Sequence, residues 1–328
     1  MIDVLYRSAK GDIRLDLGPG DVAPLLADQH GLVWINMVQE PDESAAHVLH
    51  DIFHFHPLAI DDALTESHIP KIDDWVEYVY VVLHAVLYDG SEDNRIATRE
   101  LDAFLGENYL VTYQAQPIDS VQRVWDFFER GERHLERGTG YILYLIADEI
   151  ATDYMPVIER IDVTIDRLED MLFGSPRAAF LEELFALKRA VLHMRRIIAP
   201  QREVLNKLAR GDFDVVDEAE RVYFRDVYDH FVRLHEVAEG VRDLVTGALE
   251  TYLSVVNNRM NEVMKVLTII TTLFMPITFL TGFFGMNFFE PVANLYAWTT
   301  RPVLVAVMLV MLITPLTMFF WMRSRRWL

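Results

Sequence analysis

The chain has 328 residues, of which 52% are hydrophobic, and its 30 basic and 50 acidic side chains give a formal net charge of -20. Such an acidic protein repels nucleic acid, which is therefore excluded as an expected partner, and the absence of cysteine excludes disulfides and thiolate metal sites. The residues after Asn258 hold six basic and two acidic side chains, so the first 258 residues hold 24 and 48. This acidic block is expected to be soluble, and its charge either only solubilises it or also attracts cations.

Residues 1–135 are predicted to form a cytosolic domain with mixed α-helices and β-strands. Runs of β-type residues, separated by Gly, Asp and Asn, lie at Leu32–Ile35, Val76–Leu87, Asp102–Leu105 and Tyr109–Tyr113. Helical spacing of apolar residues is found at Ala45–Phe53, Pro57–Leu64 and Val121–Glu129.

From residue 136 onward the pattern is helical. Residues 136–217 are predicted to form a cytosolic region with long helices at Tyr141–Met171 and Arg177–Ala209. A third helix is expected to start near Glu218, with no strong breaker before Phe284, and would be about 100 Å long at 1.5 Å per residue. We assign 218–262 to a stalk, self-associated in parallel, that leads directly into the membrane.

Two segments are long enough to cross a bilayer. Val266–Phe284 gives 19 residues without a charge and Pro302–Met322 gives 21. We therefore expect a first, pore-lining span over 263–284, an external loop over 285–301 and a second span over 302–322. The tail 323–328 is basic, so the positive-inside rule predicts a protein of the cell (inner) membrane with both termini in the cytoplasm.

The first span carries one stripe of small, polar or Met residues at alternating intervals of three and four, the spacing of a heptad seam. These positions are Asn261, Met264, Thr268, Thr271, Met275, Thr278, Gly282 and Gly285. In lipid the stripe has two explanations: small and hydroxyl side chains let helices pack closely, or several copies surround a water-filled axis. Asn261, Met264 and Met275 favour the second, since amides offer oxygens to a cation and Met suits a hydrophobic constriction. Neither Val266–Phe284 nor Pro302–Met322 contains an ionisable residue, which favours a passive pore.

The triplet Gly285-Met286-Asn287, just after this span, resembles the signature of the CorA family of divalent-cation channels. Other segments that resemble the family are His56–Leu64, Pro70–Ile72, Tyr223–His230, Asn258–Thr268 and the basic tail with Trp327-Leu328. The similarity covers essentially the whole chain.

The resemblance implies a funnel-shaped homopentamer with an α+β cytosolic domain (an α/β layer), a long stalk helix and two transmembrane helices. It implies that Gly285, Met286 and Asn287 select the ion, with Asn287 holding a hydrated Mg²⁺. The pore and gate positions it implies are Asn261, Met264, Leu267, Thr268, Thr271, Met275, Thr278 and Gly282. It also implies regulatory cation sites between neighbouring cytosolic domains, at Asp62 and Asp226, with Asp61 and Asp148 as further ligands. The alternative is that these four aspartates are ordinary surface carboxylates.

The loop after the triplet departs from the family pattern, which often has a Met-Pro-Glu-Leu segment there. Glu290 stands as a candidate replacement that would concentrate cations near the pore mouth. This departure leaves ion preference open among Mg²⁺, Co²⁺, Ni²⁺ and Zn²⁺. The expected function is a passive channel, closed by internal Mg²⁺, for Mg²⁺ and also Co²⁺ and Ni²⁺, with no cofactor besides Mg²⁺ as transported and regulatory ion.

Three other functions were weighed. A Zn²⁺ transporter on the same scaffold, with or without proton coupling, is the main alternative, and a membrane-anchored cation sensor that does not conduct is a third class. An enzyme is not expected, because the chain has no phosphate loop, nucleophile elbow or dinucleotide fingerprint. The pairs His54/His56 and His230/His235 lack a third ligand at convincing spacing, so structural or surface roles are expected for these histidines.

Overall fold

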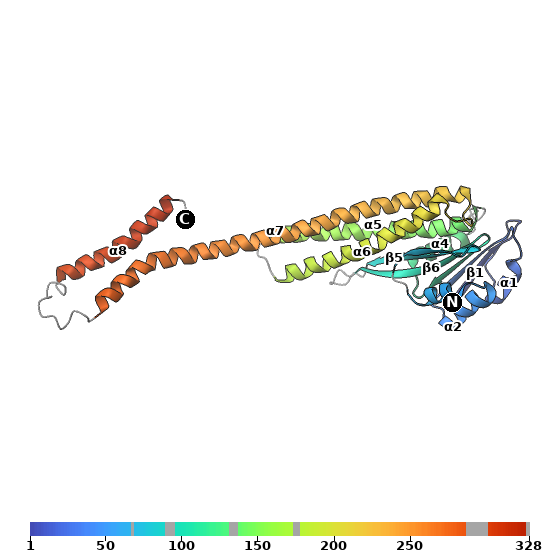
Figure 1. The fold of residues 1–328 in the computed structure, drawn as a ribbon, viewed down its shortest axis with the longest axis horizontal. Helices are drawn as coiled ribbons and strands as arrows, with labels where there is room; N and C mark the ends of the chain where they lie inside the picture. Colours follow the sequence, from blue (N-terminus) through green and yellow to red (C-terminus); the bar gives the residue numbers. More distant parts are fainter. Residues whose placement is uncertain (67–68, 89–95, 131–136, 173–177, 287–300, 326–328) are drawn as a thin grey trace. The chain divides into compact units, whose positions relative to one another are not determined.

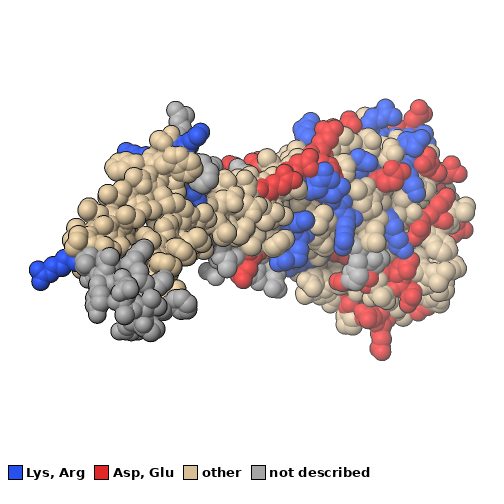
Figure 2. All heavy atoms as spheres, turned by 60° about the vertical axis from the view of Figure 1, so that its left-hand side comes forward, with Lys and Arg blue, Asp and Glu red and all other residues tan. Residues whose placement is uncertain are grey.

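A computed structural model describes residues 1–66, 69–88, 96–130, 137–172, 178–286 and 301–325 of the chain. The chain divides into two compact units, Met1–Thr251 and Tyr252–Leu328. On the face seen in Figure 2, charged side chains of both signs cover the first unit, whereas most of the second is uncharged. This division agrees with the expected separation of an acidic block from a membrane segment.

A seven-stranded mixed sheet, in the order β2-β1-β3-β7-β6-β5-β4, is the centre of the first unit (Figure 1). The strands are β1 (Ile2–Arg7), β2 (Ile13–Arg14), β3 (Leu32–Val38), β4 (Lys71–Asp74), β5 (Tyr78–Tyr88), β6 (Ile96–Gly106) and β7 (Tyr109–Gln114). All neighbouring pairs are antiparallel except β3 and β7, which are parallel. The longest register joins β5 to β6, from Tyr78 opposite Gly106 to Tyr88 opposite Ile96.

Short helices cover one face of the sheet. They are η1 (Pro19–Asp21), α1 (Val22–Leu25), α2 (Asp42–His47), the π-helix η2 (Val48–Ile52) and α3 (Pro57–Leu64). The main apolar core lies beneath them, where Phe55 stacks on Phe104 with ring centroids 4.3 Å apart. Burial of such large aromatic side chains is the main force that fixes these helices on the sheet.

The opposite face is covered by α4 (Asp119–Glu129) and α5 (Thr139–Leu172). Trp34 of β3 packs against Trp125 of α4 at 4.8 Å, and its indole N–H donates to Thr112 Oγ1 at 3.1 Å. Helix α6 (Ala178–Arg210) runs beside the edge of β5, beyond the point where β4 ends. There Gln201 Oε1 accepts from the backbone N–H of His84 at 2.9 Å, and Tyr154 donates to the carbonyl of His84 at 2.8 Å. These side chains satisfy backbone groups that have no strand partner.

The remaining helices are α7 (Glu218–Gly285), which has 68 residues, and α8 (Arg301–Ser324). In the first unit α7 buries one stripe of apolar residues at helical spacing, which includes Phe224, Val227, Phe231 and Leu234. Glu220 helps to cap the N-terminus of α7, because its Oε2 accepts a hydrogen bond from the backbone N–H of Asp217 at 3.2 Å. The boundary between the two units falls within α7, after Thr251.

The predicted fold class, an α/β domain followed by long helices and two candidate spans, is confirmed. Two of the expected element boundaries were wrong. The helix expected over Ala45–Phe53 is two elements, because the backbone changes from α to π at Val48. The strand expected from Val76 starts at Tyr78, because Val76 adopts a positive φ of 69° in a turn where its N–H donates to Asp74 Oδ1.

Candidate ion path and metal centre

Helix α7 carries the predicted stripe without interruption. It is helical through Pro276 and Gly282 and ends at Gly285, after which the N–H of Met286 donates to Phe283 O at 3.4 Å. Every stripe position from Asn261 to Gly285 is exposed in the single chain, and so is Leu267. The polar and thioether side chains therefore lie along one exposed face of the helix. Asn287 and Glu290 lie outside the described residues.

The threonines of α7 satisfy their hydroxyl groups within the helix. Thr268 donates to Met264 O at 2.8 Å, Thr271 to Leu267 O at 2.9 Å and Thr278 to Phe274 O at 3.0 Å. A hydroxyl bonded in this way can face lipid without an unpaired polar hydrogen, while its oxygen keeps a lone pair for water or an ion. The threonines alone thus fit both explanations of the stripe, and the distinction depends on Asn261 and the methionines.

A metal centre can be built in the first unit from Asp148 of α5 with Asp226 and His230 of α7. Within the described part of the chain, it is the one group of three or more His, Asp and Glu residues whose ligand atoms all lie within 4.8 Å of one another. Asp226 and His230 are four residues apart on α7 and so share a face. His230 Nδ1 lies 3.0 Å from Asp148 Oδ1.

The surroundings of this centre disfavour the ionised carboxylate of Asp148. Burial raises the pKa of Asp148, and Asp226 adds to that effect, while the neighbouring His230 acts in the opposite direction. The pKa of Tyr144 is raised to about 12 by burial and by the charges of Asp148 and Asp226. A divalent cation placed among these groups would stabilise their charged forms. Two carboxylate oxygens suit Mg²⁺, and an added imidazole nitrogen suits Co²⁺, Ni²⁺ or Zn²⁺.

Two predicted regulatory residues are not part of this group in one chain. Asp62 forms an ion pair with Lys71, whose Nζ also lies 3.2 Å from Asp73 Oδ2, and Asp61 is exposed on α3. The resemblance places Asp61 and Asp62 at an interface between neighbouring copies, which a single chain does not contain. The structure therefore brings together Asp148 and Asp226 and adds His230.

His230 is the residue of this centre that sequence reasoning missed. Its spacing of five residues from His235 argues against a shared face, so the sequence predicted a structural or surface role for His230. The signal was present in the spacing of four between Asp226 and His230, which places an oxygen and a nitrogen donor on one helical face. The third ligand, Asp148, is distant in sequence and is brought there by the packing of α5 on α7.

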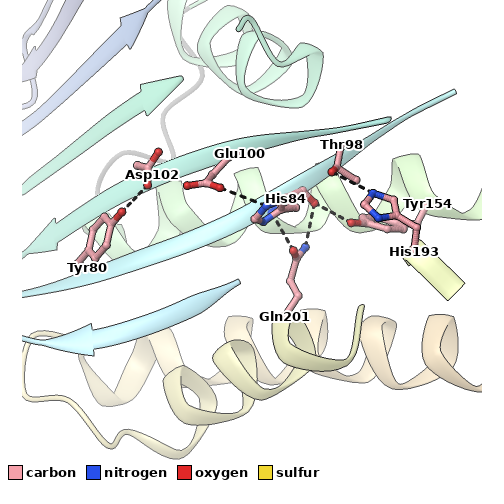
Figure 3. A network of polar contacts seen from close by, with 8 residues as sticks. All are labelled: Tyr80, His84, Thr98, Glu100, Asp102, Tyr154, His193 and Gln201. Carbon is pink, nitrogen blue, oxygen red and sulfur yellow. Dashed lines mark hydrogen bonds and ion pairs between the residues drawn. The ribbon is translucent and has the colours of Figure 1, made fainter. Parts of the chain in front are cut away.

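A second polar cluster is buried along the paired strands β5 and β6 (Figure 3). Tyr80 donates to Asp102 Oδ1 at 2.5 Å, and His84 Nε2 lies 3.4 Å from Glu100 Oε2. Burial, followed by the charge of Glu100, raises the pKa of Asp102 well above its usual range. These groups are closed off from solvent, so they stabilise the pairing of β5 with β6 and offer no path for an ion.

Comparison with known proteins finds relatives along most of the chain. The family described as CorA-like Mg²⁺ transporter protein matches residues 29–326. The cobalt/magnesium transport protein CorA of Thermotoga maritima is 34% identical over 297 residues, which cover 90% of this chain and 83% of that protein. The zinc transport protein ZntB of Yersinia pseudotuberculosis is 24% identical over 278 residues, which cover 83% and 81%.

The fold is shared with a solved structure. The CorA magnesium transporter of Methanocaldococcus jannaschii superposes with a TM-score of 0.83 and 22% identity, covering 99% of this chain and 98% of that one. Two helices of this chain, α7 and α8, are long and apolar enough to cross a membrane. The extent of the family match and the identity to the Thermotoga relative show that the chain belongs to the family of CorA-like Mg²⁺ transporter proteins.

Proposed function

We propose that the protein is a passive divalent-cation channel of the cell (inner) membrane that conducts Mg²⁺ and also Co²⁺ and Ni²⁺. The observation that carries the proposal is the uninterrupted face of α7 from Asn261 to Gly285, polar or Met-lined, uncharged within the span, and followed directly by Met286 and Asn287. Five copies of α7 around one axis would line a path with these residues, with both termini of each chain in the cytoplasm.

The outer end of that path selects the ion through Asn287. Mg²⁺ sheds its water reluctantly, so a ring of amide oxygens that accepts hydrogen bonds from the hydrated ion avoids the cost of dehydration. Gly285 and Met286 hold the turn that presents this ring, and Glu290 concentrates cations near it. Further inside, Met264, Leu267 and Met275 narrow the path and Asn261, Thr268, Thr271 and Thr278 offer oxygens, while Gly282 keeps it wide.

Internal Mg²⁺ closes the pore through the cytosolic units. Asp226 and Asp148, with His230 beside them, supply ligands from one copy, and Asp62 and Asp61 supply ligands from the next. A divalent ion between two such acidic units offsets their repulsion and holds the ring closed. When internal Mg²⁺ falls, the ions leave and the gate opens. Mg²⁺ is thus both the transported and the regulatory ion, and no other cofactor is required.

The second candidate is a Zn²⁺ transporter on the same scaffold, with or without proton coupling. The observation that favours it is the imidazole of His230 in the metal centre, since nitrogen ligands suit Zn²⁺ better than Mg²⁺. The absence of ionisable residues from the expected spans Val266–Phe284 and Pro302–Met322 favours the channel.

The test is uptake by the purified full-length protein in liposomes. Influx of Mg²⁺, Co²⁺, Ni²⁺ and Zn²⁺ is measured with and without a pH gradient and at several internal Mg²⁺ concentrations. If the protein is a channel, Mg²⁺ influx should not depend on the pH gradient, should fall as internal Mg²⁺ rises and should be lost in Asn287→Ala. Zn²⁺ influx driven by the pH gradient would support the transporter. If Asn287→Ala leaves uptake unchanged, Asn287 is not the selectivity ring.

A further inference from the structure

Within a single chain, one of the predicted regulatory carboxylates is already bonded to a cation, the ammonium of Lys71. Lys71 Nζ forms an ion pair with Asp62 Oδ2, in the last turn of α3, and lies 3.2 Å from Asp73 Oδ2 on its own strand, β4. The same Nζ lies over the ring of Tyr80 on β5, 5.2 Å from the ring centroid. Residues from α3, β4 and β5 therefore meet at this one ammonium group.

The ammonium of Lys71 is charged and partly shielded from water. Its side chain is 30% exposed, whereas that of Asp62 is 46% exposed. Burial opposes the charge, but the hydrogen bonds and charges of Asp62 and Asp73 outweigh burial, so the pKa of Lys71 is raised. Lys71 therefore offsets part of the negative charge around Asp62 throughout the physiological pH range.

Lys71 also has partners that do not include Asp62. Asp73 is two residues away on β4, so the two side chains lie on the same face of the strand. Tyr80 is fully buried and donates to Asp102 Oδ1, which fixes the position of its ring (Figure 3). A carboxylate and the face of an aromatic ring both attract an ammonium group. The ammonium thus keeps a carboxylate and a ring face when Asp62 turns to another cation.

We propose that Lys71 is a built-in counter-ion that competes with the divalent cation for Asp62 and thereby sets the internal Mg²⁺ concentration at which the channel closes. This inference rests on the proposed function, in which Asp62 supplies a ligand to the regulatory ion. One carboxylate oxygen of Asp62 is bonded to Lys71, so an ion that takes this oxygen must displace the ammonium toward Asp73 and Tyr80. The charge of Lys71 also repels the incoming ion.

The sign of the effect separates competition from a structural role. A single and a double positive charge about 5 Å apart in water repel each other enough to change affinity on the order of 10-fold. Lys71→Met removes the charge and keeps most of the length of the side chain, so Mg²⁺ should close the channel at a lower concentration. If Lys71 served only to hold α3 on the sheet, its loss would displace Asp62 and raise the Mg²⁺ concentration needed.

The experiment uses the full-length protein and two measurements. The first is the internal Mg²⁺ concentration that halves Mg²⁺ influx into liposomes. The second, which involves no transport, is the Mg²⁺ concentration that gives half of the maximal rise in thermal midpoint in detergent. The variants are Lys71→Met, Lys71→Arg, Asp62→Asn, the double variant Lys71→Met/Asp62→Asn and Lys10→Met. Lys10 is an exposed lysine of the same unit and serves as the matched control.

Lys71→Met is expected to lower both Mg²⁺ concentrations about 10-fold. Lys71→Arg, which keeps the charge, and Lys10→Met are expected to leave both unchanged. In the Asp62→Asn background, Lys71→Met is expected to have no effect. Unchanged or higher concentrations in Lys71→Met overturn the proposal, and so does an equal lowering in Lys10→Met, which would reflect net charge alone. If Lys71→Met does not fold, Lys71→Gln replaces it with the same expected result.

Asp62→Asn alone separates this inference from the proposed function. If Asp62→Asn raises both Mg²⁺ concentrations while Lys71→Met lowers neither, Asp62 is a regulatory ligand and only the competition is wrong. If Asp62→Asn leaves both concentrations unchanged, the proposed regulatory role of Asp62 fails, and the competition fails with it.

Discussion

Nδ1 of His230 lies 3.0 Å from Oδ1 of Asp148, and this contact joins the face of α7 that carries Asp226 to the middle of α5. Both helices belong to the first unit, and between them they supply one nitrogen and two carboxylate donors. An ion bound there would fix the register of α7 against α5. In the proposed channel, α7 continues into the membrane segment, so an ion bound here would act on the pore through this helix.

We predict that the carboxylate and imidazole ligands of the metal centre control closure by different ions. We expect Asp226→Asn to weaken closure by internal Mg²⁺, since Mg²⁺ depends on the carboxylate. We expect His230→Ala to leave closure by Mg²⁺ nearly intact and to weaken closure by Co²⁺ or Ni²⁺ about 10-fold or more. Influx into liposomes at graded internal Mg²⁺ or Co²⁺ measures both effects. Glu236→Gln, an exposed carboxylate on the same helix, is the control. Equal effects on Mg²⁺ and Co²⁺ in His230→Ala would refute this division of roles.

Glu220 predicts a pH dependence of stability. Burial raises its pKa from 4.5 to about 7, although backbone N–H groups of Asp217, Gly140 and Tyr141 bond to the carboxylate. The folded protein therefore holds a proton that the unfolded chain releases, so the contribution of this group to stability is present below pH 4.5 and falls as the pH rises to about 7. We expect Glu220→Gln to remove this decline, which amounts to no more than about 3 kcal/mol.

The measurement for Glu220 is the thermal midpoint of the full-length protein in detergent between pH 5 and pH 8. The midpoint of Glu220→Gln relative to the unaltered protein should rise with pH. Glu218→Gln, at an exposed position two residues before Glu220, should show the unaltered pH profile. A parallel profile in Glu220→Gln would show that the carboxyl is ionised across the range.

The buried pair of His84 and Glu100 predicts a large loss of stability on truncation. Their side chains are 4% and 5% exposed, so His84→Ala removes the imidazole beside the Glu100 carboxyl at a place that water cannot reach. We expect a loss of about 3 kcal/mol or more in the free energy of unfolding. His193→Ala, which truncates an exposed histidine on α6, should cost less than about 1 kcal/mol. Urea denaturation measures the free energy of unfolding of both variants, and equal losses would contradict a stabilising contact between buried His84 and Glu100.

Much of the fold could be predicted from local pattern. The helix expected from Glu218 to Phe284 is observed as α7, which ends at Gly285. It could be predicted because its apolar periodicity is continuous and because a proline such as Pro276 is tolerated in a membrane helix. Strands β1, β2 and β4 were missed. Strand β4 has the sequence Lys-Ile-Asp-Asp, which has low intrinsic strand preference, and it is a strand because it pairs with the edge of β5.

The candidate sites also differ in how far the sequence could predict them. The stripe on α7 follows from spacing along one helix, so the sequence was sufficient to find it. The grouping of Asp148 with Asp226 and His230 depends on the packing of two helices, so it could not be located from spacing alone. The predicted roles of Asn287 and Glu290 stay predictions, since both lie outside the described residues.

The most direct test of the central claim uses the absence of cysteine from the chain. Single cysteines are placed at Thr271, on the stripe of α7, and at Leu273, on the opposite face of the same turn. Mg²⁺ influx into liposomes is measured before and after a charged, water-soluble thiol reagent. The account predicts that the reagent stops influx through Thr271→Cys and leaves Leu273→Cys unaffected. Unchanged influx through Thr271→Cys, or block at Leu273→Cys alone, would contradict a water-filled axis lined by this stripe.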